Sequence, residues 1–342
     1  MIRSRQALRG LLALVCLLAL AGCARNPLHS QESYVFGTRV EVLVWGEPED
    51  KARAAVAEVL REFDRLHRTY HAWQPSEMTA LNEAIAAGKP RQVTPEFAGF
   101  IRDAQQMAVK GDYLFDPGVG RLVELWGFHD DTFKPQLPDP AKLAELVRAH
   151  PSIADITVDG TTVSSRNKAV ALDFGGYLKG VALDRAAAIL KGKGIANALI
   201  NIGGNVMALG SKGGTPWRVG IQHPRQTAPL ATLDLKDGEA IGTYGDYQRY
   251  FELDGKRYCH LIDPRTGWPA TATQAVTVLI PPRPDGATGM WSDVASKPLF
   301  VAGAQWRQLA ARLGLGLVLY VDAGGRVEAT DAMKARVTMT AP

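Results

Sequence analysis

The order in which helical and strand-like patterns follow one another constrains the fold of this chain more than any other feature of its sequence. Residues 217–278 mostly follow strand patterns and include a hairpin at Asp254-Gly255, whereas the preceding half alternates helices with strands. Regular strand–helix alternation would build a parallel sheet, and this chain departs from that order. We therefore expect an α+β fold, a single domain with a mixed, largely antiparallel sheet and flanking helices.

Individual elements can be predicted from local patterns. Apolar residues at helical spacing indicate a helix over 51–70, and Thr94-Pro95 supplies the N-cap and first residue of a helix that Gly111 ends. Further predicted elements are helices over 140–150, 179–191, 292–303 and 305–313, strands over 40–45, 169–173 and 198–202, and hairpins over 156–164 and 317–329.

The first 23 residues predict where the chain resides. Three arginines, Arg3, Arg5 and Arg9, precede an apolar stretch over 11–20, which is shorter than the roughly 20 residues of a membrane span. Leu20-Ala21-Gly22-Cys23 follows and resembles the bacterial lipobox, in which the cysteine is acylated. This interpretation predicts a chain that is lipid-anchored to a bacterial membrane and faces the periplasm; an ordinary cleaved signal or a short anchor is the alternative. The expected division is a lipoprotein signal peptide over 1–22, a lipidated tether over 23–33 and one domain over 34–342.

Cysteine usage and net charge narrow the class further. Cys16 would leave with the signal peptide and Cys23 would carry lipid, so Cys259 remains alone and no intramolecular disulfide is expected. The formal net charge is +4, and removing the three N-terminal arginines leaves 4 − 3 = +1. Nucleic-acid binding normally requires a basic surface, so no nucleic-acid partner is expected.

A glycine-rich turn at residues 173–180, Asp-Phe-Gly-Gly-Tyr-Leu-Lys-Gly, joins a predicted strand to a predicted helix. Glycines let the backbone approach a ligand, the N–H groups of a helix N-terminus favour phosphate, and Lys179 adds a cation. Neither GxGxxG nor GxxxxGK[ST] is present. Taken alone, the turn is either a phosphate site or an ordinary tight turn. The second glycine turn, Asn201-Ile202-Gly203-Gly204-Asn205, predicts only a β-turn by itself.

Two further groups carry side chains suited to catalysis. His260 ends a predicted strand just before a turn built by Asp263-Pro264 and Gly267, and an imidazole can accept a proton from an attacking hydroxyl near neutral pH. A packed structural histidine is the alternative. Asp293 and Ser296 are three residues apart at the start of a predicted helix. Their oxygens could hold a hard cation, or form an N-cap with a first-turn partner.

Together and in this order, these segments resemble the FAD:protein FMN transferase (ApbE) family over nearly the whole mature chain. The most specific are His-x-x-Asp-Pro-x-Thr-Gly at 260–267 and Gly-Gly-x-x-Lys-Gly at 175–180. The other matching segments are Phe36-Gly37-Thr38, Ser76-Glu77 with Leu81-Asn82, Phe115-Asp116-Pro117-Gly118-Val119-Gly120 with Leu125-Trp126-Gly127-Phe128, Gly203-Gly204-Asn205, and residues 293–300.

The resemblance implies an enzyme that transfers FMN from FAD to a Thr or Ser hydroxyl of an acceptor protein and releases AMP. It implies that His260 deprotonates the acceptor hydroxyl. An aromatic residue before Ser76 is also implied to stack on the flavin system; Trp73 or Tyr70 fits, and we prefer Trp73. The remaining implied FAD contacts are Phe36, the backbone of Leu114, Phe115 and Asp116, and Asp173, Lys179 and Ile262.

The resemblance also implies Mg²⁺, and here the chain departs from the family pattern. The implied ligands are the backbone carbonyl of Gly176 and the side chains of Asp293, Ser296 and residue 297, which is usually threonine but is Lys297 here. A protonated lysine cannot ligate Mg²⁺. Either Asp293, Ser296 and waters hold a weakened Mg²⁺ site, or the Lys297 ammonium takes over part of the charge neutralisation. Phe36 in place of methionine and Tyr244 in place of serine are lesser departures.

Three functions remain open from the sequence: the transferase, an FAD-binding lipoprotein without chemistry, and an FAD pyrophosphatase that releases AMP and FMN to water. Lys297 favours the carrier, and His260 argues against it. For a transferase, the resemblance implies as partners FAD and an acceptor flavoprotein subunit of a membrane redox complex, or a related periplasmic protein.

Overall fold

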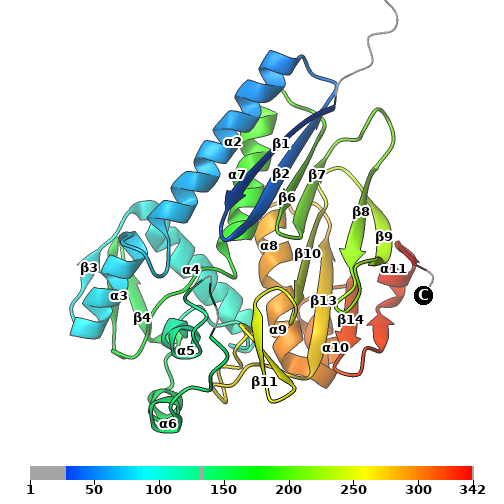
Figure 1. The fold of residues 1–342 in the computed structure, drawn as a ribbon. Coiled ribbons are helices and arrows are strands. Elements are labelled where there is room, and N and C mark those ends of the chain that lie inside the picture. The colour runs from blue at the N-terminus through cyan, green and yellow to red at the C-terminus, as the bar shows by residue number, and fades with distance from the viewer. Residues whose placement is uncertain (1–27, 131, 133, 341–342) are drawn as a thin grey trace, which may run out of the picture.

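The computed structural model describes residues 28–130, 132 and 134–340. Its largest sheet has eight strands in the order β1-β2-β6-β7-β10-β13-β14-β15, and all neighbours are antiparallel (Figure 1). The strands are β1 (Leu28–Val35), β2 (Thr38–Trp45), β6 (Ala198–Ile202), β7 (Asn205–Leu209), β10 (Ala240–Gly245), β13 (Thr273–Ile280), β14 (Val318–Asp322) and β15 (Val327–Ala329). The predicted α+β class with a largely antiparallel sheet is confirmed.

Helices cover one face of this sheet. Helix α7 packs on both α2 and α8, and α8 and α9 pack against β10 and β13. Phe63 of α2, Leu183 of α7 and Val276 of β13 are fully buried in the main core between these layers. The helices are α2 (Glu49–Thr69), α3 (Glu77–Ala87), α4 (Pro95–Lys110), α5 (Gly120–Leu125), α6 (Pro140–Ala149), α7 (Leu178–Gly192), α8 (Thr288–Val294), α9 (Ser296–Ala302), α10 (Trp306–Arg312) and α11 (Asp331–Lys334), with short 3₁₀ turns at Ile153–Asp155 and Gly303–Gln305.

The other face carries a second, smaller sheet. Strands β16 (Val337–Met339), β9 (Pro229–Leu235) and β8 (Trp217–Gln222) form it in that order. Its side chains join Ile241 of β10 and Leu279 of β13 in a separate core. Strands β7, β10 and β13 are therefore buried on both faces, which explains their nearly continuous apolar sequences.

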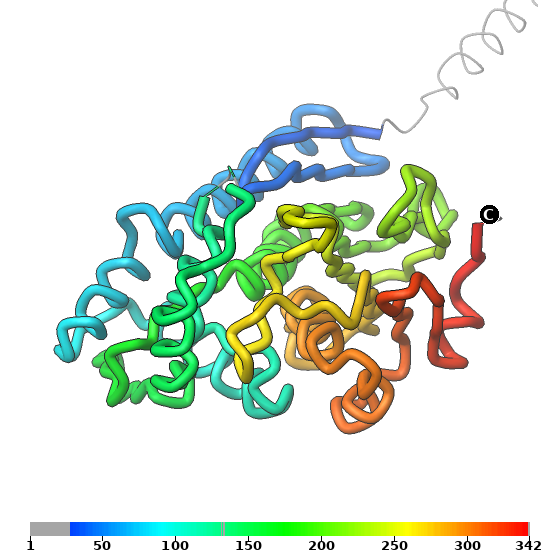
Figure 2. The backbone as a smooth tube through the Cα atoms, turned by 60° about the horizontal axis from the view of Figure 1, so that its bottom comes forward, coloured from blue at the N-terminus to red at the C-terminus, as the bar shows by residue number. Residues whose placement is uncertain are grey.

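A third group of elements lies to one side of the main layers. The hairpin of β11 (Tyr250–Leu253) and β12 (Lys256–Cys259) packs with α5 and α6 around Trp126 and Phe251. In Figure 2 this hairpin, in yellow, lies between the teal segment that carries α5 and α6 and the orange helices. A further small sheet has the order β3-β5-β4, from β3 (Arg91–Gln92), β5 (Thr162–Ser165) and β4 (Ile156–Asp159).

Local signals locate the two helices predicted most firmly. Helix α2 covers the predicted 51–70 segment with its apolar positions buried. Helix α4 begins after Thr94, whose Oγ1 accepts the Phe97 N–H at 3.3 Å, and it ends at Gly111. Among the described residues, no helix is long and apolar enough to cross a bilayer. The predicted signal peptide and Cys23 lie outside the described residues.

Three expectations about local structure are wrong. Residues 28–33, assigned to a tether, belong to β1, which pairs with β2 along its whole length. The strand expected over 169–173 is an extended segment with a single bridge at Ala171, because the side chain of Asn82 makes both backbone bonds of Leu172. The helix expected over 292–303 is broken at Ala295, since Pro298 has no N–H to donate to the carbonyl four residues earlier.

Candidate active site

A cavity of about 600 Å³ opens where several separate segments meet, and its size suits a cofactor-sized ligand. Its lining includes the β1–β2 turn, the end of α2 and the loop after it, the loop after α4, α5, the start of α7, the end of β10 and the loop after it, the β12–β13 connection, and α9. The predicted site residues that line it are Phe36, Trp73, Leu114, Phe115, Asp116, Asp173, Gly176, Lys179, His260, Ile262 and Lys297. Asp293 and Ser296 are fully buried behind this lining, where Asp293 contacts Lys297.

Helix α7 begins in close contact with α8, because Gly180 has no side chain to separate the two helices. A Cβ on Gly180 would lie 2.5 Å from the Gly289 carbonyl oxygen and 2.7 Å from the Asp293 Cβ. This close approach lets the Gly180 N–H donate to Asp293 Oδ2 at 2.9 Å. The last glycine of the Gly-Gly-x-x-Lys-Gly segment thus brings the helix N-terminus onto the Asp293 carboxylate.

The other oxygen of Asp293 is also occupied. Asp293 Oδ1 accepts from Lys297 Nζ at 2.7 Å and from Asn205 Nδ2 at 3.2 Å. Burial opposes the ionisation of Asp293, but the charges of Lys297 and Lys179 outweigh it, and its pKa lies below the usual value. The buried carboxylate is therefore ionised and accepts three hydrogen bonds from the protein, whereas the neighbouring Asn205 Oδ1 has no hydrogen-bond partner among the described residues.

These contacts do not fit a hard divalent cation. Mg²⁺ requires near-octahedral oxygen ligands, yet both Asp293 oxygens already accept protein hydrogen bonds. The Ser296 hydroxyl donates to the Asp293 carbonyl at 3.0 Å, and the Lys297 ammonium donates to the same carbonyl at 2.5 Å. Within the described part of the chain, no group of three His, Cys, Asp or Glu side chains is arranged to hold a metal.

Lys297 itself is nearly fully buried and enclosed by three neighbours. Its Nζ lies 3.6 Å from the centroid of the Tyr244 ring, in cation–π geometry. A Cβ on Gly176 would lie 2.5 Å from Lys297 Cε, so only a glycine leaves room for the lysine stem. Burial lowers the pKa of Lys297 to about 8, although the Asp293 charge opposes this shift. The side chain is therefore mostly cationic at neutral pH.

His260 is held in one tautomer by the backbone of Arg249. Its backbone N–H donates to the Arg249 carbonyl at 3.1 Å, and its Nδ1 lies 3.2 Å from the same oxygen. A carbonyl only accepts, so Nδ1 carries the proton and Nε2 is left with a free lone pair. Burial, followed by the charges of Arg249 and Lys179, lowers the pKa of His260 to about 3. The imidazole is a neutral proton acceptor at physiological pH.

The glycine turn before α7 places the Asp173 carboxyl group and the Lys179 amine in the same cavity. Asp173 Oδ1 accepts the Gly175 N–H at 2.7 Å, which closes the turn. Lys179 Nζ lies 4.8 Å from the Tyr244 ring centroid, on the same aromatic side chain that Lys297 contacts. Together with Arg249, these lysines give the cavity three cationic residues in its lining.

Aromatic residues line the opposite part of the cavity. Phe36 has φ 56°, a left-handed conformation that costs a non-glycine residue about 1 kcal/mol or more. Trp73 is half-buried, and the Arg249 guanidinium carbon lies 5.3 Å from its ring centroid. The two-residue turn Phe36-Gly37 between β1 and β2 requires positive φ at both residues, and this turn places the Phe36 side chain at the cavity.

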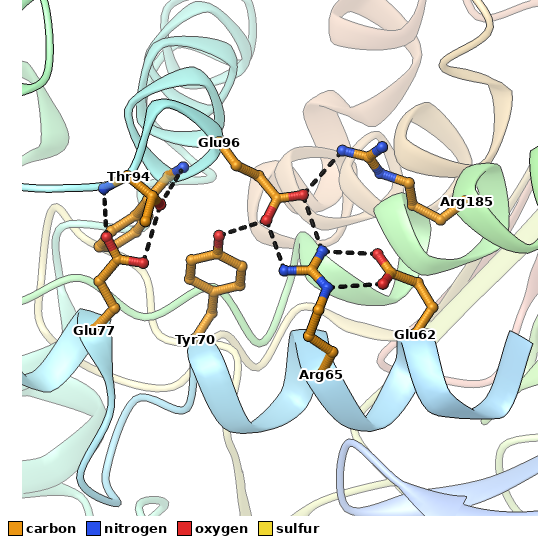
Figure 3. A network of polar contacts seen from close by, with 8 residues as sticks. Glu62, Arg65, Tyr70, Glu77, Thr94, Glu96 and Arg185 are labelled. Atoms are coloured by element: carbon orange, nitrogen blue, oxygen red, sulfur yellow. Dashed lines mark hydrogen bonds and ion pairs between the residues drawn. The ribbon is translucent and has the colours of Figure 1, made fainter. Parts of the chain in front are cut away.

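A network of ion pairs supports this aromatic part from the outside (Figure 3). The buried Tyr70 donates through its hydroxyl to Glu96 at 2.8 Å, and Glu96 also accepts from Arg65 and Arg185. Glu77 accepts from the N–H and hydroxyl of Thr94, which ties α3 to α4. Because the Tyr70 ring is buried and packs on Phe97 and Phe100, the half-buried Trp73 is the more available aromatic surface.

The Asp116 carboxylate stabilises a loop at the cavity edge through bonds within the protein. Its Oδ1 accepts from the N–H groups of Gly118 and Ile153, both at 2.8 Å, and its Oδ2 accepts from Ser152 at 2.5 Å. Burial raises its pKa despite these bonds. The backbone of Leu114, Phe115 and Asp116 is thereby held at the cavity edge.

Sequence reasoning missed two residues of this arrangement. Arg249 lines the cavity and positions His260, and Asn205 bonds to Asp293, although its segment predicted only a turn. Asn205 acts on a partner 88 residues away, whereas Arg249 meets His260 because both flank the β11–β12 hairpin, whose register pairs Tyr250 with Cys259. The predicted Asp293–Ser296 pair is also placed differently: Asp293 lies in the last turn of α8, and Ser296 begins α9.

Comparison with known proteins is consistent with this geometry. A family model described as the ApbE family matches residues 36–319. The chain is 42% identical over 339 residues to an FAD:protein FMN transferase of Rhodobacter capsulatus, covering 97% of this chain but 64% of that relative's length. It is 28% identical to an FAD:protein FMN transferase of Haemophilus influenzae, covering 96% of this chain and 98% of the relative.

Solved structures give the same result for the fold. The ApbE protein of Thermotoga maritima matches with a TM-score of 0.81 at 30% identity, covering 91% of this chain and 99% of that one. A histidine-to-glycine mutant of the flavin transferase ApbE of Vibrio cholerae matches with a TM-score of 0.78 at 26% identity, with the same coverage of each chain.

Proposed function

The chain belongs to the ApbE family, and from that premise we propose that it transfers the FMN half of FAD onto a threonine or serine hydroxyl of an acceptor protein, with release of AMP. The observation that carries the proposal is the environment of His260. A neutral imidazole with Nε2 unprotonated lines the same cavity as the cationic residues Lys179 and Lys297. Such a cavity can bind a pyrophosphate and accept the proton of an attacking hydroxyl.

The proposed binding mode divides FAD between the two parts of the cavity. The flavin lies against Phe36 and Trp73, beside the backbone of residues 114–116 and Ile262. The pyrophosphate lies at the Gly175-Gly176 turn, where Lys179 neutralises part of its charge. Asp173 closes that turn.

The proposed reaction is a displacement at the phosphorus on the FMN side. The acceptor oxygen forms the new P–O bond, the bridging P–O bond breaks, and AMP leaves with that bond's electron pair. The hydroxyl proton passes to His260 Nε2, while the Arg249 carbonyl holds Nδ1–H and orients the ring. Cations beside the phosphoryl oxygens stabilise the transition state.

The family resemblance implies Mg²⁺ in this reaction, held by the Gly176 carbonyl, Asp293 and Ser296. The contacts of Asp293 and Lys297 do not fit that ion, so the proposed reaction uses protein groups alone.

The proposed setting is the periplasmic side of a bacterial membrane. We propose that lipidation at Cys23 anchors the chain, facing the periplasm, and that the acceptor is a flavoprotein subunit of a membrane redox complex or a related periplasmic protein. The motif Leu20-Ala21-Gly22-Cys23 supports the anchor. Metabolic labelling with a palmitate analogue, lost in Cys23→Ser, tests it.

One incubation tests the reaction. The protein is mixed with FAD and a periplasmic acceptor domain, in EDTA and separately in Mg²⁺, and the acceptor is analysed by intact mass. Covalent FMN on the acceptor is expected. Free FMN with AMP would instead indicate a pyrophosphatase, and unchanged FAD under both conditions would indicate a carrier.

A further inference from the structure

The wall of the cavity beside Asp293 already contains a cation that belongs to the protein. Lys297 Nζ donates to Asp293 Oδ1 at 2.7 Å and to the Asp293 carbonyl at 2.5 Å, and its side chain lines the cavity. From this geometry we infer that the Lys297 ammonium replaces the divalent metal ion of the family site, so that FAD binding and flavin transfer proceed without metal. The inference about transfer rests on the proposed function; the inference about FAD binding does not.

Two departures from the family pattern support this replacement because they contact each other. Tyr244 stands where the family usually has serine, and Lys297 where it usually has threonine. The Lys297 ammonium lies 3.6 Å from the Tyr244 ring centroid. The aromatic face therefore gives the buried charge a favourable contact that it would otherwise lack. A lysine substituted into an unchanged metal site would have no such partner.

Residues of the family-matching segments accommodate the lysine without changing. Gly176 leaves room for Lys297 Cε, which would lie 2.5 Å from a Cβ at that position. Asn205 Nδ2 and the Gly180 N–H also donate to the Asp293 carboxylate. Gly176 and Gly180 belong to one segment and Asn205 to another, and the carboxylate they surround is paired with the Lys297 ammonium.

The cavity also has other cations that compensate for the lower charge of an ammonium. Lys179 Nζ lies 4.8 Å from the Tyr244 ring centroid, and Arg249 lines the same cavity. A pyrophosphate carries two negative charges. Lys297, Lys179 and Arg249 bring three positive charges to the cavity, and Asp293 offsets one of them, so two remain to balance the pyrophosphate. Lysine binds phosphate as a point charge, so no octahedral geometry is required.

The first test uses the unmodified protein and needs no variant. After dialysis against EDTA, FAD affinity is measured by flavin fluorescence, and AMP release is measured in the presence of the acceptor. Both are expected to change by less than about twofold when millimolar Mg²⁺ is added. A loss of FAD binding in EDTA that Mg²⁺ restores would overturn the inference, and so would metal-dependent AMP release.

The second test restores the family residues in the double variant Lys297→Thr with Tyr244→Ser. In EDTA its FAD affinity should weaken at least about tenfold and its AMP release should fall by about 100-fold, and Mg²⁺ should restore both. Lys110→Thr is the control, because Lys110 is an exposed lysine outside the cavity lining. A double variant that remains as active in EDTA as the parent protein would show that Lys297 is not the required cation.

The two tests separate this inference from the proposed function. If no acceptor becomes flavinylated under any condition, the proposed transfer fails, but the metal-independence of FAD binding by the unmodified protein still decides the role of Lys297. If flavinylation occurs only with Mg²⁺, the proposed function holds and the inference about Lys297 is wrong.

Discussion

The two halves of the cavity are built in opposite ways. The phosphate-side wall, formed by Gly180, Asn205, Asp293 and Lys297, is buried, and its polar groups bond to one another across chain separations of up to 113 residues. The flavin-side wall, formed by Phe36, Tyr70 and Trp73, is supported by an ion-pair network with exposed arginines. The difference indicates that the charged groups beside the phosphates must be held rigidly in position, whereas the flavin ring needs only an aromatic surface on which to stack.

The largest effect on flavin transfer is expected at His260, which belongs to neither wall and supplies the proton acceptor. His260→Asn should reduce flavin transfer by about 100- to 10,000-fold, because the hydroxyl proton loses its acceptor. FAD affinity should change by less than about threefold, since binding depends on the two walls. Single-turnover kinetics and equilibrium FAD binding measure the two quantities, and a parallel loss of both would place His260 in the binding wall instead.

The pH response of His260 reports its burial first, and then the positive charges of Arg249 and Lys179. The pKa of about 3 means that the folded protein resists protonation that the unfolded chain accepts near pH 6.5. Between these values the unfolded state binds more protons, so stability is lost as the pH falls from 6.5 towards 3 and is unaffected by this group above 6.5. NMR of the labelled ring in the ligand-free protein should show no titration near pH 6.5. A midpoint there would contradict the proposed burial among cations.

Close packing makes the phosphate-side wall intolerant of added volume. Gly180→Ala should lower the free energy of unfolding by about 1–3 kcal/mol, because the new Cβ would lie 2.5 Å from the Gly289 oxygen. Gly192→Ala, in the same helix with no atom within 4 Å of its Cβ position, is the matched control and should be neutral or stabilising. Urea unfolding measures both. Equal stabilities would mean that the α7–α8 contact can relax.

Substitutions in the flavin-side wall should change FAD affinity rather than folding stability. Trp73→Ala should weaken FAD binding by about tenfold through lost stacking, whereas Trp73→Phe should retain most of the affinity. Stability should change little, because Trp73 is only half-buried. If Trp73→Ala has no effect on binding while Tyr70→Leu weakens it in a protein that urea unfolding shows to be folded, the stacking residue is Tyr70.

The smallest effect is expected in the network outside that wall. Glu96→Gln should cost about 1 kcal/mol or less, because its partners Arg65 and Arg185 are largely exposed and screened by salt. The loss should shrink further at high ionic strength in urea unfolding. The exposed Glu124, mutated to Gln, serves as the control. A loss of several kcal/mol would show that the two walls are equally rigid.

Much of the fold followed from local patterns. The periodicity of α2, the Thr94-Pro95 start of α4 and the hairpin turns each predicted an element that the structure contains. The segments with catalytic side chains were also found, because glycine turns and a histidine before a turn are visible in the chain itself. The incorrect predictions concern elements whose limits depend on another segment of the chain. One example is the extended stretch at Leu172, whose backbone bonds are made by the side chain of Asn82 instead of a neighbouring strand.

The sequence by itself determined the order of the elements, the class of the fold and the residue types available for chemistry, since these depend on short-range periodicity and backbone preference. Only the tertiary structure decided that Lys297 pairs with Asp293 under the Tyr244 ring, and that the Arg249 carbonyl sets the tautomer of His260. The physical reason is that a buried charge takes its partners from whichever segments packing brings within hydrogen-bond distance. For Asp293 these include Gly180 and Asn205, which are 113 and 88 residues away in the chain.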